Sequence, residues 1–247
     1  MKSLVVSDLH ANEVALSAVM DHVANRGIER IICLGDFVGY GARPNEVLER
    51  MRTAEADLFY VRGNHDRVAA GLDQGDDFNQ AARSAAHWTR DQLSLENSDF
   101  LVNLPLGPRE DADGVLICHG SPADEDEYIF SEIEAARIFS EFESSVMFFG
   151  HTHLPVIFAL TEDKVLFGNL IDQPGVVQLD RRRRYLINPG SVGQPRDRNP
   201  LSSFAIFDSE AFSIQFFRIP YDIAATQRAI IDAGLPKILA DRLSYGF

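Results

Sequence analysis

The stretch Leu4-Val5-Val6-Ser7-Asp8-Leu9-His10 is a short apolar run that leads directly into two side chains of metal-binding type. Its β-branched residues predict a buried strand, which ends where the ligands begin. Four further apolar runs, at residues 31–34, 58–61, 115–118 and 146–149, are followed in the same way by Gly35-Asp36, Gly63-Asn64-His65-Asp66, His119-Gly120 and Gly150-His151-Thr152-His153. Because ligand sites in layered α/β sheets gather at the carboxyl ends of strands, we expect these side chains to converge on one pocket.

The order of elements in the first third of the chain predicts a layered α/β fold. Helical spacing over residues 12–26, which stops at Gly27, and over residues 44–51 alternates with the first three strands. Two further helices are expected at residues 78–95 and 98–104. The segment from about residue 67 to residue 104 is therefore a candidate helical cap over the site.

From residue 154 onward the chain changes to short extended pieces that suggest a second sheet. These pieces lie at residues 156–160, 164–167, 176–179, 185–187, 204–207 and 212–217. Two sheets packed face to face, with helices outside, would bury all the apolar runs in one core. At the end of the chain, residues 221–234 and 235–243 predict one or two closing helices, which either cover a sheet or contact another copy of the chain.

Length and composition favour one domain over residues 1–247. The hydrophobic fraction is 45%, and no linker, low-complexity tract or internal repeat divides the chain. No apolar run approaches the roughly 18 residues needed to span a bilayer, and Asp8 interrupts the first one, so a cytoplasmic protein is expected. The two cysteines, Cys33 and Cys118, fall inside strand runs and are expected to be buried free thiols.

The net charge of −14 opposes stable binding to nucleic acids or anionic membranes, because long-range repulsion acts against polyanions. Part of this charge lies on Asp8 and Asp36, which bound divalent cations would neutralise. With its metal ions bound, the site would therefore be positively charged although the protein as a whole is negatively charged. A small anionic substrate remains compatible with the composition.

The carboxylates of the strand-end motifs suit a pair of metal ions. Asp8 and His10 are two residues apart, so strand alternation would point them the same way. Gly35 allows a close backbone approach before Asp36. Asp36 is the expected bridging ligand, because its two oxygens can hold two cations at the roughly 3.5–4 Å spacing that two-metal hydrolysis needs.

The remaining motif residues supply an amide, imidazoles and a further carboxylate. Asn64 can ligate through its carbonyl oxygen, His65 can face the phosphoryl or leaving-group oxygen, and Asp66 can orient His65 and stabilise its charged form. Further nitrogen ligands are expected from His119, His151 and His153. Any one of these histidines alone is more simply an ordinary hydrogen-bonded residue, but their shared position at strand ends favours ligation.

The ordered set of motifs over roughly residues 4–160 resembles the calcineurin-like metallophosphoesterases. The resemblance implies a four-layer αββα fold of two packed mixed sheets flanked by helices. It implies that one metal is held by Asp8, His10, Asp36 and His153, and a second by Asp36, Asn64, His119 and His151. It also implies that a metal-bridging hydroxide attacks phosphorus in line, while His65 stabilises the transition state or protonates the leaving group.

The sequence departs from the protein Ser/Thr phosphatases of this superfamily, which continue their Gly-Asp motif with Asp-Arg-Gly. Here the run is Gly35-Asp36-Phe37-Val38-Gly39-Tyr40-Gly41, so Tyr40 stands where the phosphate-binding arginine would be. The chain instead resembles the compact bacterial and archaeal phosphoesterases, which commonly carry a loop like Asn188-Pro189-Gly190-Ser191-Val192-Gly193. That loop could shape the pocket, although tight-turn chemistry explains its proline and glycines equally well.

Several charged residues outside the motifs are candidates for substrate contacts. Arg43, Arg67 and Arg196 lie near a motif or the glycine loop and are the predicted phosphate-binding residues. The acidic stretch Asp124-Glu125-Asp126-Glu127 follows His119 closely; it is either a repulsive rim for polyanions or a plain exposed loop. Residues 181–184, all arginine, are read as a solvated turn.

These observations predict a divalent-metal-dependent phosphoesterase that acts on a phosphate monoester or diester of a small molecule or nucleotide. A protein Ser/Thr phosphatase and a dinucleoside-polyphosphate hydrolase are alternatives with the same metal site. A non-catalytic scaffold, like the retromer subunit of the superfamily, is less consistent because that subunit lacks the equivalent of His65. The expected cofactor is two divalent ions, with Mn²⁺ first and Fe, Zn²⁺, Ni²⁺ or Co²⁺ also compatible with the mixed donors.

Overall fold

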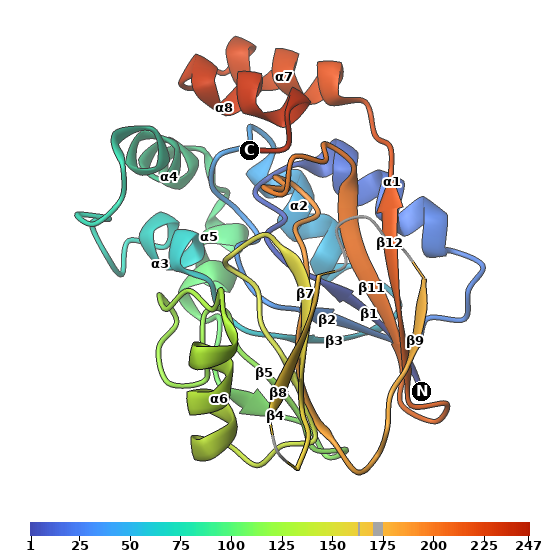
Figure 1. The fold of residues 1–247 in the computed structure, drawn as a ribbon. Helices are drawn as coiled ribbons and strands as arrows, with labels where there is room; N and C mark the ends of the chain where they lie inside the picture. The colour runs from blue at the N-terminus through green and yellow to red at the C-terminus, as the bar shows by residue number, and fades with distance from the viewer. Residues whose placement is uncertain (163, 170–174) are drawn as a thin grey trace.

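A computed structural model describes residues 1–162, 164–169 and 175–247 of the chain. Within this part, twelve strands form two mixed sheets of six strands each, packed face to face with helices on the outside (Figure 1). The predicted αββα sandwich is therefore confirmed. None of the helices in these ranges is both long enough and apolar enough to cross a membrane.

The first sheet, called sheet A, has the strand order β3-β2-β1-β11-β12-β9. Its strands are β1 (Lys2–Val6), β2 (Arg30–Cys33), β3 (Asp57–Tyr60), β9 (Val176–Gln178), β11 (Ser202–Asp208) and β12 (Ser213–Ile219). Strands β1, β2 and β3 run parallel, with Val6 opposite Cys33 and Cys33 opposite Tyr60. The segments that follow these three strands therefore leave the sheet at the same edge.

The second sheet, called sheet B, has the order β4-β5-β6-β10-β7-β8. Its strands are β4 (Arg109–Glu110), β5 (Val115–Ile117), β6 (Val146–Phe148), β7 (Pro155–Leu160), β8 (Val165–Asn169) and β10 (Arg184–Pro189). Strands β5, β6 and β10 are parallel, with Ile117 opposite Phe148 and Phe148 opposite Ile187. Sheet B thus also has one edge where three strands end together.

The sequence suggested that the late extended segments form a second sheet of their own, but they are divided between the two sheets. Strands β9, β11 and β12 join sheet A, and β11 pairs antiparallel with β1. The reason is that β11 is covered on both faces: Ala205 packs between the sheets, whereas Phe204 packs under helix α1 (Glu13–Val23). A strand with two buried faces carries no pattern that would assign it to one sheet or the other.

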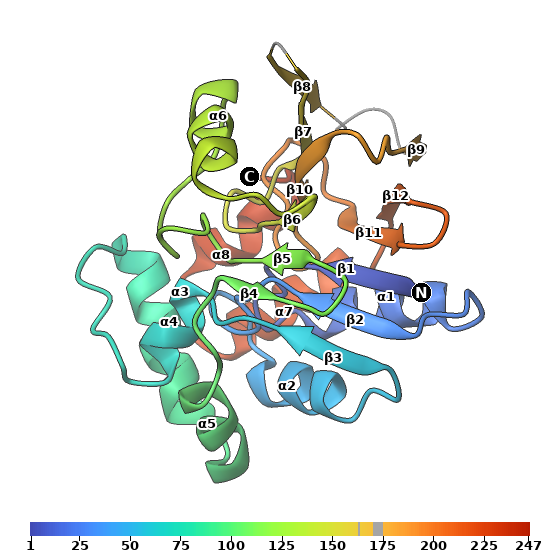
Figure 2. The same ribbon diagram turned by 90° about the horizontal axis from the view of Figure 1, so that it is seen from below.

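Helices cover the outer faces of both sheets (Figure 2). Helices α1, α2 (Pro44–Arg52) and α5 (Leu95–Val102) bury apolar side chains against sheet A. Helix α6 (Glu132–Glu141) packs Ile138 and Phe139 against sheet B. Ser131 and Glu134 form a capping box at its N-terminus, and the helix that follows has ten residues.

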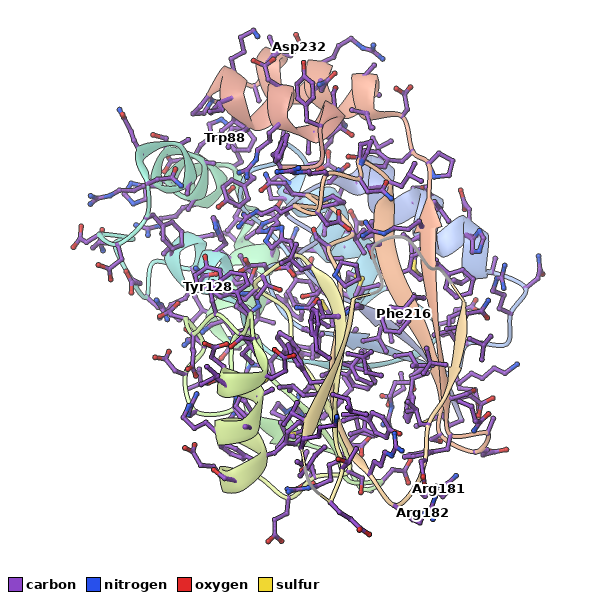
Figure 3. All side chains as sticks on the ribbon, viewed as in Figure 1. Trp88, Tyr128, Arg181, Arg182, Phe216 and Asp232 are labelled. Carbon is purple, nitrogen blue, oxygen red and sulfur yellow. The ribbon has the colours of Figure 1, made fainter. Side chains whose placement is uncertain are left out.

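A third group of helices lies beyond the carboxyl edges of the strands. It comprises α3 (Asn64–Ala69), α4 (Gln80–Gln92), α7 (Ile223–Asp232), α8 (Lys237–Asp241) and the 3-10 helix η1 (Arg242–Ser244). Trp88 of α4 packs against a cluster that includes Leu235 and Leu239 from the C-terminal segment (Figure 3). The same cluster contains Tyr40. A capping function for residues 67–104 stays a prediction.

Candidate metal centre

The carboxyl edges of the two sheets face one another, and all seven predicted metal-binding side chains meet there. Sheet A contributes Asp8, His10, Asp36 and Asn64, and sheet B contributes His119, His151 and His153. Each of these residues is at most 8% exposed. The structure therefore brings together residues that lie as far apart as positions 8 and 153 in the sequence.

The direction of these side chains comes from left-handed turns rather than from strand alternation. Strand β1 ends at Val6, and both Asp8 (φ 54°) and His10 (φ 49°) lie beyond it. Asp36, His151 and His153 also have positive φ angles of 54°, 63° and 60°. Such conformations cost roughly 1–2 kcal/mol each for residues other than glycine. Their concentration at one place indicates a backbone shaped for function.

Two glycines allow the loops of sheet A to approach closely. A Cβ atom on Gly35 would lie 2.6 Å from the Gly63 nitrogen, and one on Gly63 would lie 2.2 Å from Asp36 Oδ1. Neither contact is sterically possible. The expectation that Gly35 serves a close backbone approach agrees with this geometry.

One group of donors consists of Asp8, His10 and His153, whose ligand atoms lie within 4.8 Å of one another. The two Nε2 atoms are 3.2 Å apart, and His153 Nε2 is 3.4 Å from Asp8 Oδ1. Nδ1 of His10 donates to the Val38 carbonyl at 3.2 Å, and Nδ1 of His153 donates to the Gln194 carbonyl at 2.5 Å. These backbone partners fix the tautomers and leave each Nε2 lone pair facing the centre.

A second group consists of Asp8, Asp36 and His119. His119 Nε2 lies 3.5 Å from Asp36 Oδ2 and 3.2 Å from Asn64 Oδ1. His151 Nδ1 is 3.2 Å from the same nitrogen. Nδ1 of His119 donates to the Leu34 carbonyl at 2.7 Å, so its other ring nitrogen is again directed to the centre. Asp36 is close to both groups, since its Oδ2 is also 3.6 Å from His10 Nε2.

Burial controls the protonation of these side chains. It lowers the pKa of His10 and of His153 well below the usual value and, with the nearby charge of His119, lowers that of His151 to about 3. Burial raises the pKa of Asp8 to about 7. At His119, burial is outweighed by the Asp36 carboxylate, which raises the pKa to about 10. Burial likewise opposes the low pKa of Asp36, which the charge of His119 above all holds well below its usual value.

The donor set fits divalent cations. Both carboxylate oxygens of Asp8 are buried and have no hydrogen-bond partner in the described part of the chain. A buried carboxylate without a partner is strongly unfavourable, so a positive charge is expected beside it. Imidazole nitrogens, carboxylate oxygens and the amide oxygen together match the preferences of Mn²⁺, Fe, Zn²⁺, Ni²⁺ and Co²⁺. These side chains are therefore candidate ligands for metal ions.

The run Gly63-Asn64-His65-Asp66 forms the start of α3, with Gly63 as the N-cap and the next three residues in the first turn. Asp66 accepts hydrogen bonds from the Gly63 and Val38 amides at 3.0 and 3.1 Å, so its carboxylate closes the helix N-terminus. Among the described residues, the expected hydrogen bond from His65 to Asp66 is not formed. The reason is that a carboxylate at the third helical position is drawn back to the free amides that precede it.

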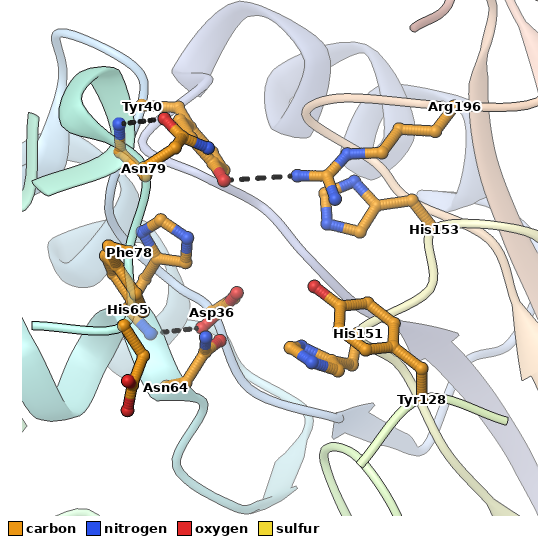
Figure 4. A pocket seen from close by; sticks show the side chains of 12 residues that line it. Asp36, Tyr40, Asn64, His65, Phe78, Asn79, Tyr128, His151, His153 and Arg196 are labelled. Carbon is orange, nitrogen blue, oxygen red and sulfur yellow. Dashed lines mark hydrogen bonds between the residues drawn. The ribbon is translucent and has the colours of Figure 1, made fainter. Parts of the chain in front are cut away.

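The ring of His65 is held by aromatic neighbours. Its centroid lies 4.3 Å from that of Tyr40 and 4.5 Å from that of Phe78. Burial lowers the pKa of His65 to about 4, so the imidazole is neutral near pH 7. His65 lines the pocket over the two groups of donors (Figure 4).

Of the three predicted phosphate-binding arginines, Arg196 lines this pocket, whose volume is about 110 Å³. Its Nη2 donates to the Tyr40 hydroxyl at 3.3 Å (Figure 4). The same nitrogen donates to Gln194 Oε1 at 3.1 Å. The structure does not bring the other two to the pocket lining. Arg67 is paired with Asp73, Glu125 and Asp126, and Arg43 is paired with Glu46 on the exposed side of α2.

Six pocket residues are not among the candidates from the sequence: Tyr40, Asp77, Phe78, Asn79, Ala82 and Tyr128. Tyr40 is notable in the sequence only because it replaces an arginine. Ala82 lies in α4, and the other four lie on connecting segments where no strand end marks them.

Comparisons with known proteins agree with this geometry. The sequence profile of the calcineurin-like phosphoesterase superfamily domain matches residues 1–211. The crystal structure of a metallophosphoesterase from Sphaerobacter thermophilus superposes with a TM-score of 0.86 and 40% identity, covering 100% of this chain and 99% of that one. The "Uncharacterized protein MJ0912" of Methanocaldococcus jannaschii is 40% identical over 98% of this chain and 97% of its own length. Phosphodiesterase YfcE of Escherichia coli K12 is 24% identical over 87% of this chain and 91% of its own.

Proposed function

The chain belongs to the calcineurin-like phosphoesterase superfamily, and we propose that it is a binuclear, divalent-metal-dependent hydrolase of phosphate monoesters or diesters. The observation that carries the proposal is the convergence of seven buried donors from two sheets, four of which line one pocket. In this proposal residues 1–247 act as one domain. The substrate is a small phosphorylated molecule or nucleotide in the cytoplasm.

The two groups of donors support an assignment to two ions. Asp8, His10, Asp36 and His153 would hold one, and Asp36, Asn64, His119 and His151 the other. Asp36 is the shared ligand because its Oδ2 lies within 3.6 Å of His10 Nε2 and 3.5 Å of His119 Nε2. We place Mn²⁺ first and keep Fe, Zn²⁺, Ni²⁺ and Co²⁺ as alternatives.

When bound, the cations would neutralise charge on the phosphoryl oxygens and lower the pKa of water, so that it is a nucleophile near neutral pH. The chain itself supplies the groups around the phosphoryl group. Arg196 faces the pocket and contributes a fixed positive charge to a phosphoryl oxygen. His65, held between Tyr40 and Phe78, contributes a hydrogen bond to the leaving-group oxygen. Asp66 keeps the His65 turn in place through the Gly63 and Val38 amides.

The pocket has a volume of about 110 Å³, less than the roughly 300–1,000 Å³ of usual ligand pockets, so it suits a phosphoryl group or a small substrate that extends beyond it. Phosphate diesters come first among the substrates to be tested, since the related Escherichia coli protein is named a phosphodiesterase. A protein Ser/Thr phosphatase is less consistent with the site because Tyr40 replaces the arginine of those enzymes. Dinucleoside polyphosphates belong in the same assay, because they would use the same donors.

The test is turnover of chromogenic monoester and diester substrates, compared side by side with each candidate metal. We expect hydrolysis that requires added divalent ions and is lost by at least about a hundredfold in His65→Ala, in keeping with the usual contribution of an acid–base group. His65→Ala should keep the metal content of the original protein. His22→Ala changes the same residue type on α1, away from the pocket, and should leave turnover unchanged. The absence of hydrolysis with every metal would contradict the proposal and favour a scaffold.

A further inference from the structure

Three aromatic rings form a continuous stack that runs from the metal centre to the protein surface. The Tyr128 ring lies against His151 with centroids 4.0 Å apart and planes 29° apart. It also stacks with Phe130 at 5.4 Å and 6°. Phe130 is 58% exposed and Tyr128 45%, whereas His151 is buried. Tyr128 therefore contacts both a candidate metal ligand and a surface ring, which restrict the orientation of its own ring.

The edge of the Tyr128 ring that carries the hydroxyl points into the pocket (Figure 4). It enters from the side of His151, across the pocket from His65 and Phe78. The second phenol of the pocket, Tyr40, already accepts a hydrogen bond from Arg196. Within the described residues no hydrogen bond is recorded for the Tyr128 hydroxyl, so this donor is available to a bound molecule.

The acidic stretch at residues 124–127 fixes the segment that carries this tyrosine. Glu125 is 7% exposed in its side chain and forms ion pairs with Arg62, at 3.1 Å, and with Arg67. Glu127 pairs with Arg137 of α6 at 2.6 Å. On the other side of Tyr128, Ile129 is 1% exposed and packs into the core of sheet B. The stretch is thus neither a repulsive rim nor a plain loop, because its carboxylates hold the residues before Tyr128 in place.

We propose that Tyr128 is a substrate contact of this site: its hydroxyl donates a hydrogen bond to a phosphoryl oxygen, from the side opposite His65. Glu125 and Glu127 are positioning residues for it. The inference rests on the proposed function and deepens it, because it adds a neutral donor to the positive charge of Arg196. A donor that is held in place before the substrate arrives costs little ordering entropy, which makes it effective in stabilising charge.

The decisive variant is Tyr128→Phe, which keeps the stacked ring and removes only the hydroxyl. A hydrogen bond to a charged oxygen contributes about 1.5–3 kcal/mol, so kcat/KM should fall by roughly 10- to 150-fold. Metal content should stay at the original value. The matched control is Tyr245→Phe, the same chemical change at a side chain that is 64% exposed, and it should leave all these values unchanged.

A binding measurement separates this inference from the proposed function. Calorimetric titration of the Mn²⁺-loaded protein with inorganic phosphate should show an affinity at least about tenfold weaker in Tyr128→Phe than in Tyr245→Phe, for the loss of one such hydrogen bond. If the original protein hydrolyses no phosphate ester but this difference holds, the proposed function fails and the contact stands. If the protein is an active esterase and Tyr128→Phe matches the control in turnover and phosphate affinity, the inference is overturned.

The positioning role has its own test. Glu127→Gln removes the ion pair to Arg137 at a partly exposed site, so folding should be preserved. We expect kcat/KM to fall severalfold in the original background and not to change further when Glu127→Gln is added to Y128F. An equal loss in both backgrounds would show that Glu127 acts on something other than the hydroxyl.

Discussion

The carboxyl edges of the two sheets differ in the chemistry that they bring to the pocket. The edge of sheet A supplies the oxygen donors Asp8, Asp36 and Asn64, together with one imidazole, His10. The edge of sheet B supplies imidazoles alone, from His119, His151 and His153. Each of the two groups of donors therefore combines residues from both sheets. The packing of the two sheets against each other is what completes the site.

The apolar core between the sheets explains why their carboxyl edges are held in a fixed position relative to each other. Val5 and Ile32 of sheet A and Phe148 and Ile187 of sheet B belong to one buried cluster and are each at most 1% exposed. Cores of this kind are packed as densely as organic crystals, so the sheets have little freedom to slide. The distance between a carboxylate of one sheet and an imidazole of the other is thus set by residues that never touch the ligands.

The largest effect is expected from the oxygen-rich edge. Asp36→Asn removes a carboxylate whose Oδ2 lies 3.6 Å from His10 Nε2 and 3.5 Å from His119 Nε2, so it should weaken both ions. Metal ions contribute several kcal/mol to charge stabilisation in the transition state, and we expect turnover to fall about a thousandfold or more. Elemental analysis should show a loss of bound metal in parallel.

The matched control is Asp57→Asn, which lies at the start of β3, at the opposite edge of sheet A, and is 64% exposed in its side chain. Its ion pair with Arg30 is exposed, so both turnover and metal content should stay close to the original. Equal behaviour of the two variants would contradict the importance of the carboxyl edge.

A smaller loss of turnover is expected when a ligand is removed from the carboxyl edge of sheet B. His119→Asn removes a nitrogen from the second group but leaves Asp8, His10 and His153 together. We expect metal content to fall from about two ions to about one, and turnover to fall about a hundredfold, the upper end for changes around a metal site. The measurement is metal-to-protein ratio with kcat on the same samples. Loss of both ions here, with retention of one in Asp36→Asn, would reverse the proposed difference between the edges.

Metal binding should also stabilise the contact between the sheets, because its ligands come from both. At a free Mn²⁺ concentration of about 100 times Kd, each site adds about 2.7 kcal/mol to the free energy of unfolding. For a chain of this size, that raises Tm by roughly 5–10 °C for one site. Calorimetry with and without a chelator measures the shift. An unchanged Tm in a protein that still binds Mn²⁺ would mean that the ions bind the unfolded chain equally well and do not depend on the folded site.

The sequence predicted the convergence of the ligands because each apolar run is short, buried and followed at once by a polar side chain. Parallel pairing of β1, β2 and β3, and of β5, β6 and β10, then brings those ends to one place. The direction of Asp8 and His10 was predicted for the wrong reason, since left-handed turns and not strand alternation orient them. Such turns leave little trace in residue types other than glycine.

Other parts of the structure could not be predicted, because the sequence carries no pattern that indicates them. Strands β11 and β12 carry apolar residues on both faces, so their sheet could not be assigned. Helix α3 has only six residues, too few to show a helical period. Tyr128 and Phe130 lie on the segment before α6, where they stack on each other while Glu125 pairs with Arg62 and Glu127 with Arg137. Contacts of this kind are a property of the folded chain.

The central claim, that two ions lie between the two sheets and share Asp36, is tested most directly by crystallography of the Mn²⁺-soaked protein with anomalous data at the manganese edge. We expect two peaks roughly 3.5–4 Å apart, both beside the Asp36 carboxylate. The imidazoles of sheet B should lie on one side of them, and Asp8 and Asn64 on the other. A single peak distant from Asp36, or no peak between the sheets, would contradict it.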